Sequence, residues 1–137
     1  MHSLITDLKN ILITHEGLKL KPYKDTVGKI TIGVGRDLDD MGITEDEAML
    51  MLDNDIARTV AEANEFTWFS SLSENRQIVI CSMIFNLGLS RFKNFKNMIA
   101  AIEIQHFCNA AEEMRNSTWA TQVGDRCNQL AAMMTTG

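Results

Sequence analysis

The sequence predicts an α+β fold, in which a small sheet-containing lobe is joined by one long helix to an all-helical C-terminal lobe. Two patterns support this prediction. Residues 18–35 hold short extended pieces separated by glycines in turn-like places, which is typical of a small antiparallel sheet. From residue 44 onward, apolar residues recur at helical spacing. At 137 residues, the chain has the size of one domain with a substantial core.

The helices are predicted from their apolar spacing and their end signals. Residues 3–15 form an amphipathic helix that Ser3 caps and Gly17 ends. Residues 44–65 form a long helix, because a threonine and a glutamate at its start have capping-box spacing. An apolar run beginning near residue 73 predicts a buried helix at the centre of the helical lobe. Further helices are expected at about 94–103, 106–115 and 122–134.

These elements predict one domain over residues 1–137, with two lobes. The small lobe spans about 14–43, and the helix between the lobes spans about 44–65. The helical lobe comprises about 66–137 together with residues 1–13, so the first helix is expected to pack on the C-terminal lobe. A cleft between two lobes is the place where a polymeric substrate would lie.

The composition narrows the possible functions. With 45% hydrophobic residues, 23% charged residues and a net charge of −5, the chain is typical of a soluble globular protein, and nucleic acid is not an expected partner. It has neither a secretory signal nor the run of roughly 18 apolar residues that a membrane span needs, so we expect a cytoplasmic protein without membrane insertion. Its three cysteines lie in apolar helical patterns without a CxxC pair and are expected to be reduced and packed. We expect a monomer that needs no metal and no cofactor.

Two acidic residues are candidates for glycosidic bond cleavage. That reaction needs a carboxylic acid to protonate the leaving oxygen and, with inversion, a second carboxylate to activate a water. Glu16 lies at the end of the first helix, where apolar neighbours would favour the protonated form. Asp25 follows Tyr23 in the turn region, where a polar site would keep it ionised. The chain holds 18 acidic residues, so this spacing alone is not specific.

The sequence around these two acidic residues is more informative than their spacing. Residues 16–35 read EGLKLKPYKDTVGKITIGVG, and this stretch closely resembles the active-site segment of phage-type lysozymes, glycoside hydrolase family 24. The resemblance implies that Glu16 is the general acid, that Asp25 is the second catalytic carboxylate, and that Thr31 helps to hold the attacking water. It also implies a lysozyme-like fold. Shorter similarities extend over most of the chain, at residues 43–48, 83–88, 95, 117–119 and 136–137.

The resemblance implies further substrate-binding residues in the helical lobe. Asn86 stands where the family has a polar residue that lines the sugar cleft, and Arg126 stands where an arginine approaches the catalytic glutamate. Trp119 is a candidate platform for sugar stacking, and core packing is the alternative interpretation of a tryptophan in such a lobe. The three residues are expected to bind substrate from the helical lobe.

The chain departs from the family pattern after the Gly-x-Gly run. Many relatives have a histidine there, whereas this chain has Arg36. The family's histidine meets an acidic residue of the long helix, so we expect Arg36 to pair with Asp55. Few residues separate Arg36 from Ile43, which predicts a shortened small lobe.

The function implied by the resemblance is that of a phage endolysin. Such an enzyme hydrolyses the β-1,4 bond between N-acetylmuramic acid and N-acetylglucosamine in bacterial peptidoglycan, with inversion, and degrades the wall for host lysis and phage release. Release from the host cytoplasm would depend on a holin. Two alternatives stay open: a lytic transglycosylase, which needs only the catalytic acid, and a non-catalytic wall-binding module of a virion.

Overall fold

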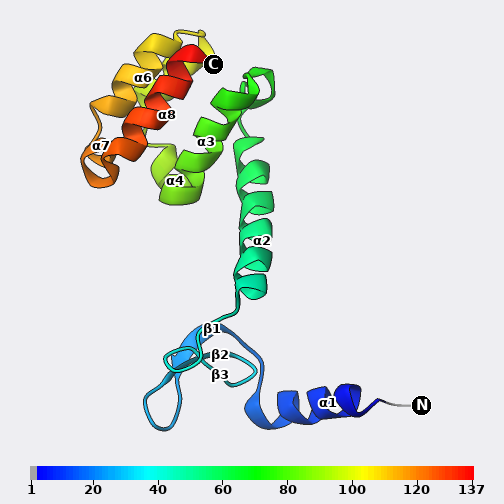
Figure 1. Ribbon diagram of the computed structural model, residues 1–137. Helices are drawn as coiled ribbons and strands as arrows, with labels where there is room; N and C mark the ends of the chain where they lie inside the picture. The colour runs from blue at the N-terminus through cyan, green and yellow to red at the C-terminus, as the bar shows by residue number, and fades with distance from the viewer. Residues whose placement is uncertain (1–2) are drawn as a thin grey trace. The chain divides into compact units, whose positions relative to one another are not determined.

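The computed structural model describes residues 3–137 and divides into two compact units, one ending at Leu50 and one running from Met51 to Gly137. Figure 1 shows the elements of both units. The first unit holds α1 (Leu4–Glu16), β1 (Lys19–Lys24), β2 (Ile30–Gly33) and β3 (Arg36–Asp37). Helix α2 (Glu45–Ala63) begins in the first unit and ends in the second. The second unit continues with η1 (Phe69–Ser71), α3 (Glu74–Leu87), α4 (Leu89–Phe92), α5 (Lys96–Glu103), α6 (Phe107–Arg115), α7 (Thr118–Val123) and α8 (Asp125–Thr136). The α+β fold class predicted from the sequence is confirmed.

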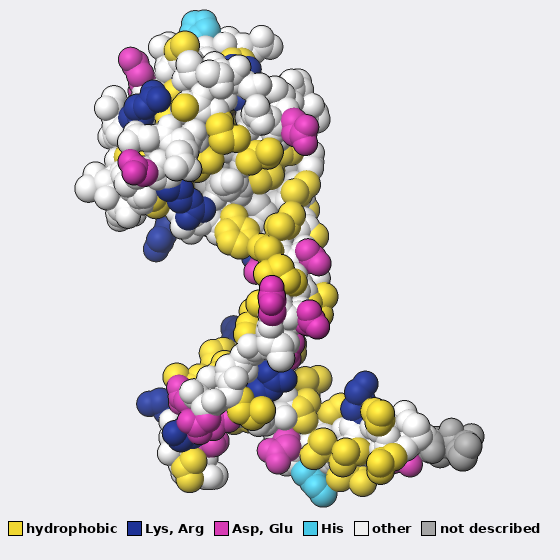
Figure 2. Space-filling model, viewed as in Figure 1, with side chains coloured by type: hydrophobic (Ala, Val, Ile, Leu, Met, Phe, Trp, Pro, Cys, Tyr) yellow, Lys and Arg dark blue, Asp and Glu magenta, His cyan; other side chains and the backbone are white. Residues whose placement is uncertain are grey.

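Both ends of α1 follow the local signals in the sequence. The Ser3 hydroxyl accepts a hydrogen bond from the Thr6 amide at 3.0 Å, which caps the helix. Gly17 has a φ of +80°, and its N–H donates to the Ile13 carbonyl at 2.9 Å, which ends the helix. Figure 2 shows hydrophobic side chains along α1, and the exposed ones are Leu4, Ile5, Leu8, Ile11, Leu12 and Ile13. Such a stripe is typical of a helix that packs on another surface, and the packing of residues 1–13 on the helical lobe stays a prediction.

The three strands form one antiparallel sheet in the order β1-β2-β3. Thr31 lies on the middle strand and is paired with Tyr23 on one side and with Asp37 on the other. The register of β1 shifts before Tyr23, in the segment that contains Pro22. Proline cannot donate to a strand ladder, and β1 tolerates it because it is an edge strand. The predicted small sheet is therefore confirmed.

The core of the second unit is built around α3, as the apolar run predicted, although only part of that helix is buried. Ile78 and Phe85 lie on another face of α3 and are 46% and 47% exposed. They line an apolar groove of about 470 Å³ together with Leu52, Ile56 and Val60 of α2. The largest fully buried side chains of the core are Phe92, Ile80, Met83, Ile84, Met98, Ile102, Met114, Met134, Val79 and Cys127.

A continuous series of aromatic rings runs through this core. Phe66 stacks on Trp68 with a centroid distance of 4.8 Å and meets Phe92 edge-on at 5.6 Å. Phe92 stacks on Phe95 at 6.4 Å, and Phe95 meets the edge of Trp119 at 6.2 Å. Offset and edge-to-face pairs add attraction beyond the area that they bury. The series links the segment after α2 to α7.

The prediction of one helix over 122–134 is wrong. Gly124, with a φ of +60°, separates α7 from α8, so Val123 ends one helix and Asp125 begins the next. The Ser117 hydroxyl caps α7 by accepting a hydrogen bond from the Ala120 amide at 3.1 Å. A helix as short as α7 has too few residues for apolar spacing to reveal it.

Arg76 of α3 ties the last helix to the rest of the unit. Its Nε donates to the Met134 carbonyl at 2.8 Å, and Nη2 donates to the Thr135 carbonyl at 3.1 Å. The guanidinium also lies over the Phe107 ring, 3.6 Å from its centroid. Because the last carbonyls of a helix lack partners within the helix, this side chain caps the C-terminus of α8.

We expect Arg76→Ala to destabilise the protein by about 1–3 kcal/mol, because it removes two charge-assisted hydrogen bonds and a cation–π contact. Urea unfolding followed by far-ultraviolet circular dichroism measures the change. The matched control is Arg91→Ala, since Arg91 is an exposed arginine of α4. Equal midpoints for Arg76→Ala and the control would contradict the capping role.

Candidate active site

Glu16 is the last residue of α1, and its exposed side chain lies against the backbone of Gly35. A Cβ atom built on Gly35 would come within 2.7 Å of Glu16 Oε2 and 3.1 Å of its Cδ. Gly35 also has a φ of +67°, a conformation that side-chain-bearing residues rarely adopt. The glycine is therefore required twice, once by its own backbone and once by the approach of the Glu16 carboxyl group.

Asp25 lies in the turn between β1 and β2, and its carboxylate is fixed by the backbone of that turn. Oδ1 accepts hydrogen bonds from the amides of Val27 at 2.9 Å and Lys29 at 2.8 Å. The Asp25 carbonyl accepts a further bond from the Gly28 amide at 3.1 Å. Both side-chain bonds use Oδ1, so Oδ2 makes no hydrogen bond within the part of the chain that the structure describes. That oxygen is the free acceptor of a positioned carboxylate.

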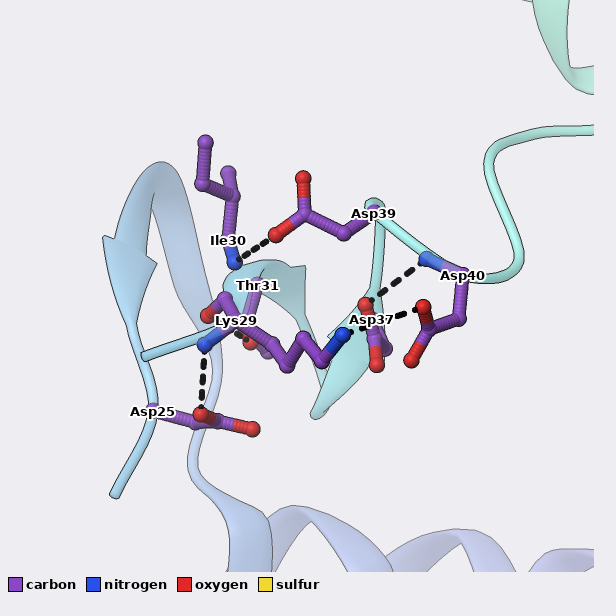
Figure 3. A network of polar contacts seen from close by, with 7 residues as sticks. All are labelled: Asp25, Lys29, Ile30, Thr31, Asp37, Asp39 and Asp40. Atoms are coloured by element: carbon purple, nitrogen blue, oxygen red, sulfur yellow. Dashed lines mark hydrogen bonds and ion pairs between the residues drawn. The ribbon is translucent and has the colours of Figure 1, made fainter. Parts of the chain in front are cut away.

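Thr31 is buried in the middle strand, and its hydroxyl donates to the Lys29 carbonyl at 2.9 Å. The same carbonyl accepts a hydrogen bond from the Asp25 amide at 2.9 Å. Figure 3 shows Asp25, Lys29 and Thr31 in this arrangement. One backbone oxygen therefore brings together two of the residues that the sequence analysis assigned to the reaction. Lys29 contributes through its backbone here, so no side-chain motif indicated it.

A second polar network supports the start of β2 and was not predicted. The Ile30 amide donates to Asp39 Oδ2 at 2.8 Å, and Lys29 Nζ pairs with Asp40 Oδ1 at 3.3 Å (Figure 3). The Asp40 amide donates to Asp37 Oδ1 at 3.1 Å and thereby lowers the pKa of the Asp37 carboxyl. The Asp37 carboxyl in turn raises the pKa of Asp40. These contacts hold the segment after β3 against the strand that carries Thr31.

The pairing of Arg36 with Asp55 that the sequence analysis expected is wrong. Nη1 of Arg36 donates to Oε1 of Glu47 at 2.9 Å, and Nη2 donates to Oε2 at 2.8 Å. Nη1 also donates to the Gly42 carbonyl at 3.1 Å, whereas Asp55 pairs with Arg58, one turn along α2, at 2.9 Å. The fork of a guanidinium matches a carboxylate in this two-point geometry.

The predicted capping box at the start of α2 is confirmed, and Glu47 completes it. Its Oε1 accepts a hydrogen bond from the Thr44 amide at 2.8 Å, and its own amide donates to the Thr44 hydroxyl at 3.1 Å. The bonds from Arg36, and next those from Thr44, lower the pKa of the Glu47 carboxyl to about 2. Glu47 is therefore an ionised link between the start of β3 and the first turn of α2.

The remaining predicted site residues lie in the second unit. Asn86 is exposed at the end of α3, and its Oδ1 accepts a hydrogen bond from Trp119 Nε1 at 2.8 Å. Trp119 is only 3% exposed, packs edge-on against Phe95, and lines a polar cavity of about 830 Å³. Arg126 is exposed at the start of α8 and lines the apolar groove. The structure pairs Asn86 with Trp119, and the roles of all three residues in substrate binding stay predictions.

The cysteines, the possible metal ligands and the apolar character of the helices bear on other kinds of function. Cys127 is buried and Cys81 is half-buried, as expected of packed thiols, whereas Cys108 is exposed, so the prediction of packed cysteines holds only in part. Within residues 3–137, no three histidine, cysteine or acidic side chains are grouped as metal ligands would be. None of the helices in that range has both the length and the apolar character needed to cross a membrane.

Comparisons with known proteins agree on one family. The family model described as phage lysozyme matches residues 13–134. A protein named "Probable T4-type lysozyme 2", from Dictyostelium discoideum, is 30% identical over 165 aligned positions, which cover 98% of this chain and 96% of that protein. A protein named "Endolysin", from Salmonella phage P22, is 30% identical over 116 positions, covering 79% of this chain and 75% of that protein. The first alignment is longer than this chain, so that relative contains residues that this chain lacks.

A third similarity involves a longer protein. The "Pre-baseplate central spike protein Gp5" of Enterobacteria phage T4 is 24% identical over 160 positions, which cover 95% of this chain but only 28% of the spike protein. A sequence of this type therefore also occurs as one part of a larger protein.

The lowered pKa of Glu47 predicts an acid-sensitive contribution to stability. Its pKa falls from an ordinary value of 4.5 to about 2 on folding, so the contribution is complete above pH 4.5 and is lost as the pH falls towards 2. We expect Glu47→Gln to melt below the wild type at pH 6, with a difference that shrinks between pH 4.5 and 2, as measured by differential scanning calorimetry. Glu45→Gln, in the same helical turn, is the control. A difference that is constant with pH would contradict this assignment.

Proposed function

Because the chain belongs to the phage lysozyme family of glycoside hydrolases, we propose that it hydrolyses the β-1,4 bond between N-acetylmuramic acid and N-acetylglucosamine in bacterial peptidoglycan. The observation that carries the proposal is the arrangement in the first unit. The Asp25 carboxylate is held by turn amides, and Thr31 is tied to the same turn through the Lys29 carbonyl. Glu16 ends the preceding helix with its carboxyl group against Gly35.

In the proposed reaction, Glu16 is the general acid and Asp25 is the general base. A water oxygen forms a bond to C1 of the muramic acid while the bond from C1 to the leaving O4 breaks. The proton of Glu16 passes to O4, and a proton of the water passes to Asp25. Oδ2 of Asp25 is the oxygen free to accept that proton, because Oδ1 is occupied by the turn amides. The water ends on the face of the sugar opposite the leaving group, so the configuration at C1 is inverted.

In this proposal, Thr31 binds the attacking water and not the sugar. Its hydroxyl hydrogen is used in the bond to the Lys29 carbonyl, so its oxygen is left as an acceptor. A water that donates one hydrogen to Thr31 and the other to Asp25 is oriented with a lone pair free for attack. This is the role that the family pattern implies for the threonine.

We propose that Asn86, Trp119 and Arg126 bind the substrate from the second unit. The exposed amide of Asn86 suits hydrogen bonds to sugar hydroxyl and acetamido groups, and the bond from Trp119 fixes its orientation. In this proposal the indole of Trp119 acts chiefly through Asn86, since the ring is almost fully buried. The expected approach of Arg126 to the acid stays a prediction.

The proposed setting is host lysis at the end of phage growth. The relatives named endolysin support it. In this proposal the enzyme is a monomer that stays in the host cytoplasm until a holin releases it to the wall. The Dictyostelium discoideum relatives carry the name lysozyme outside phages, so wall hydrolysis is supported more broadly than phage release.

The similarity to the T4 spike protein favours one alternative setting, a wall-degrading part of a virion. The catalytic proposal is the same in both settings, because it depends only on Glu16, Asp25 and Thr31. Lysis from within, measured by expressing the chain with and without a holin, separates the endolysin setting from the virion setting.

The decisive test of the proposed enzyme is the removal of the acid. Glu16→Gln keeps the shape of the side chain but removes its proton, so we expect activity to fall by at least about 10²-fold. Clearing of outer-membrane-stripped bacteria measures the loss, and Glu112→Gln, on an exposed position of α6, is the control. Near-full activity of Glu16→Gln would rule out the proposed mechanism.

The product tests the proposed stereochemistry. Inversion at a β-glycosidic bond gives an α-configured reducing end as the first product. Proton NMR of a fresh digest, recorded before mutarotation, reports the anomer directly. A β product would show retention, and anhydro-muramic ends seen by mass spectrometry would instead show a lytic transglycosylase.

A further inference from the structure

We propose that Glu47 is a positioning residue for the catalytic acid, acting on Glu16 through Arg36 and Gly35. The proposal depends on the proposed function only in taking Glu16 as the acid. Glu47 itself lies in the first turn of α2 and has no assigned part in the reaction. Three linked contacts connect Glu47 to Glu16, and all of them lie within the first unit.

The first contact is the one between Glu16 and Gly35. Glu16 is exposed and ends its helix, so the packing of neighbouring side chains does little to restrict its carboxyl group. The close surface beneath it is the backbone of Gly35, where even a single methyl group would come within 2.7 Å of Oε2. The Gly35 backbone therefore bounds the carboxyl group on one side, and a shift of that backbone changes the positions that the carboxyl group can take.

The second contact fixes the residue after that glycine. Arg36 begins β3 and is paired with Ile32 in the sheet. Its guanidinium is held at both terminal nitrogens by Glu47, at 2.9 and 2.8 Å. A two-point contact restrains the direction of the arginine as well as its distance. Gly35 is thus followed by a residue whose backbone and side chain are both held.

The third contact anchors Glu47. Thr44 bonds to its side chain and to its amide, so the carboxylate is part of the helix cap and does not rotate freely. The capped start of α2 is in this way connected, through Arg36, to Gly35, whose backbone lies against the acid. A misplacement of about 1 Å in a reacting group can cost about 10²-fold in rate, so a restraint of this kind is large enough to matter.

The test uses Glu47→Gln, Arg36→Gln and the double variant, with Glu45→Gln as the control. Glutamine at position 47 can still complete the capping box but loses the ion pair. Glu45 is an exposed acidic residue of the same helical turn, so its replacement removes an equal charge without touching Arg36. Arg36→Lys keeps the charge, loses the two-point contact, and serves as the conservative variant.

Two measurements are made on each full-length variant, well below its melting temperature. The first is the NMR cross-peak between the Glu16 side-chain Hγ protons and the Gly35 Hα protons, which reports their proximity without reference to activity. The second is kcat and KM on soluble peptidoglycan fragments. A merely structural role would lower the melting temperature and leave both measurements unchanged.

We expect the cross-peak to weaken in Glu47→Gln and Arg36→Gln, and kcat to fall by about tenfold with little change in KM, which is part of the loss that misplacement can cause. The double variant should be no worse than the worse single variant, because both remove the same restraint. Arg36→Lys should be intermediate, and Glu45→Gln should match the wild type.

An unchanged cross-peak in Glu47→Gln would overturn the proposal, whether or not kcat falls. Losses in kcat that multiply in the double variant would also overturn it, since independent effects combine in that way. If Glu16→Gln proves active, the proposed function fails, while the cross-peak still reports on the position of Glu16. The two failures are therefore distinguishable.

Discussion

The carbonyl oxygen of Lys29 accepts two hydrogen bonds, from the Asp25 amide and from the Thr31 hydroxyl, and the arrangement of Asp25 and Thr31 in the candidate site depends on this one group. The Lys29 amide donates to the Asp25 carboxylate, so the backbone groups of one residue contact both Asp25 and Thr31. Backbone groups have fewer accessible positions than side chains, and a site built on them is correspondingly well defined. The pairing of Tyr23 with Thr31 continues the same hairpin into the sheet.

The features predicted well from the sequence are those whose cause is local. Ser3 and Gly17 bound the first helix, and Thr44 with Glu47 begins α2, because each signal acts over no more than four residues. The small sheet followed from glycine placement. The three residues assigned to catalysis came from similarity to a known family and not from spacing, since the chain has many acidic residues.

The features predicted poorly depend on the path of the backbone. Arg36 was expected to meet Asp55 of α2, but the short connection brings Glu47 of the first turn to it instead. Both acidic residues can be read from the sequence, but only the geometry of the turn determines which of them pairs with Arg36. Likewise, the break at Gly124 follows from its positive φ, whereas glycine in a helical pattern is often tolerated. The apolar spacing did not predict α7, because that helix is too short to show a helical period.

The aromatic series in the second unit has a consequence for how the protein is observed. Both tryptophans, Trp68 and Trp119, belong to that unit, while the candidate catalytic residues belong to the first. Intrinsic fluorescence excited at the red edge therefore comes from side chains of residues 51–137, and none of the emitting residues belongs to the turn that holds Asp25. The first unit carries the single tyrosine, Tyr23, paired directly with Thr31, so tyrosine emission is the native optical signal of the candidate active site. The two kinds of chromophore are therefore divided between the two compact units of the chain, so a change in tyrosine emission and a change in tryptophan emission have their origin in different units.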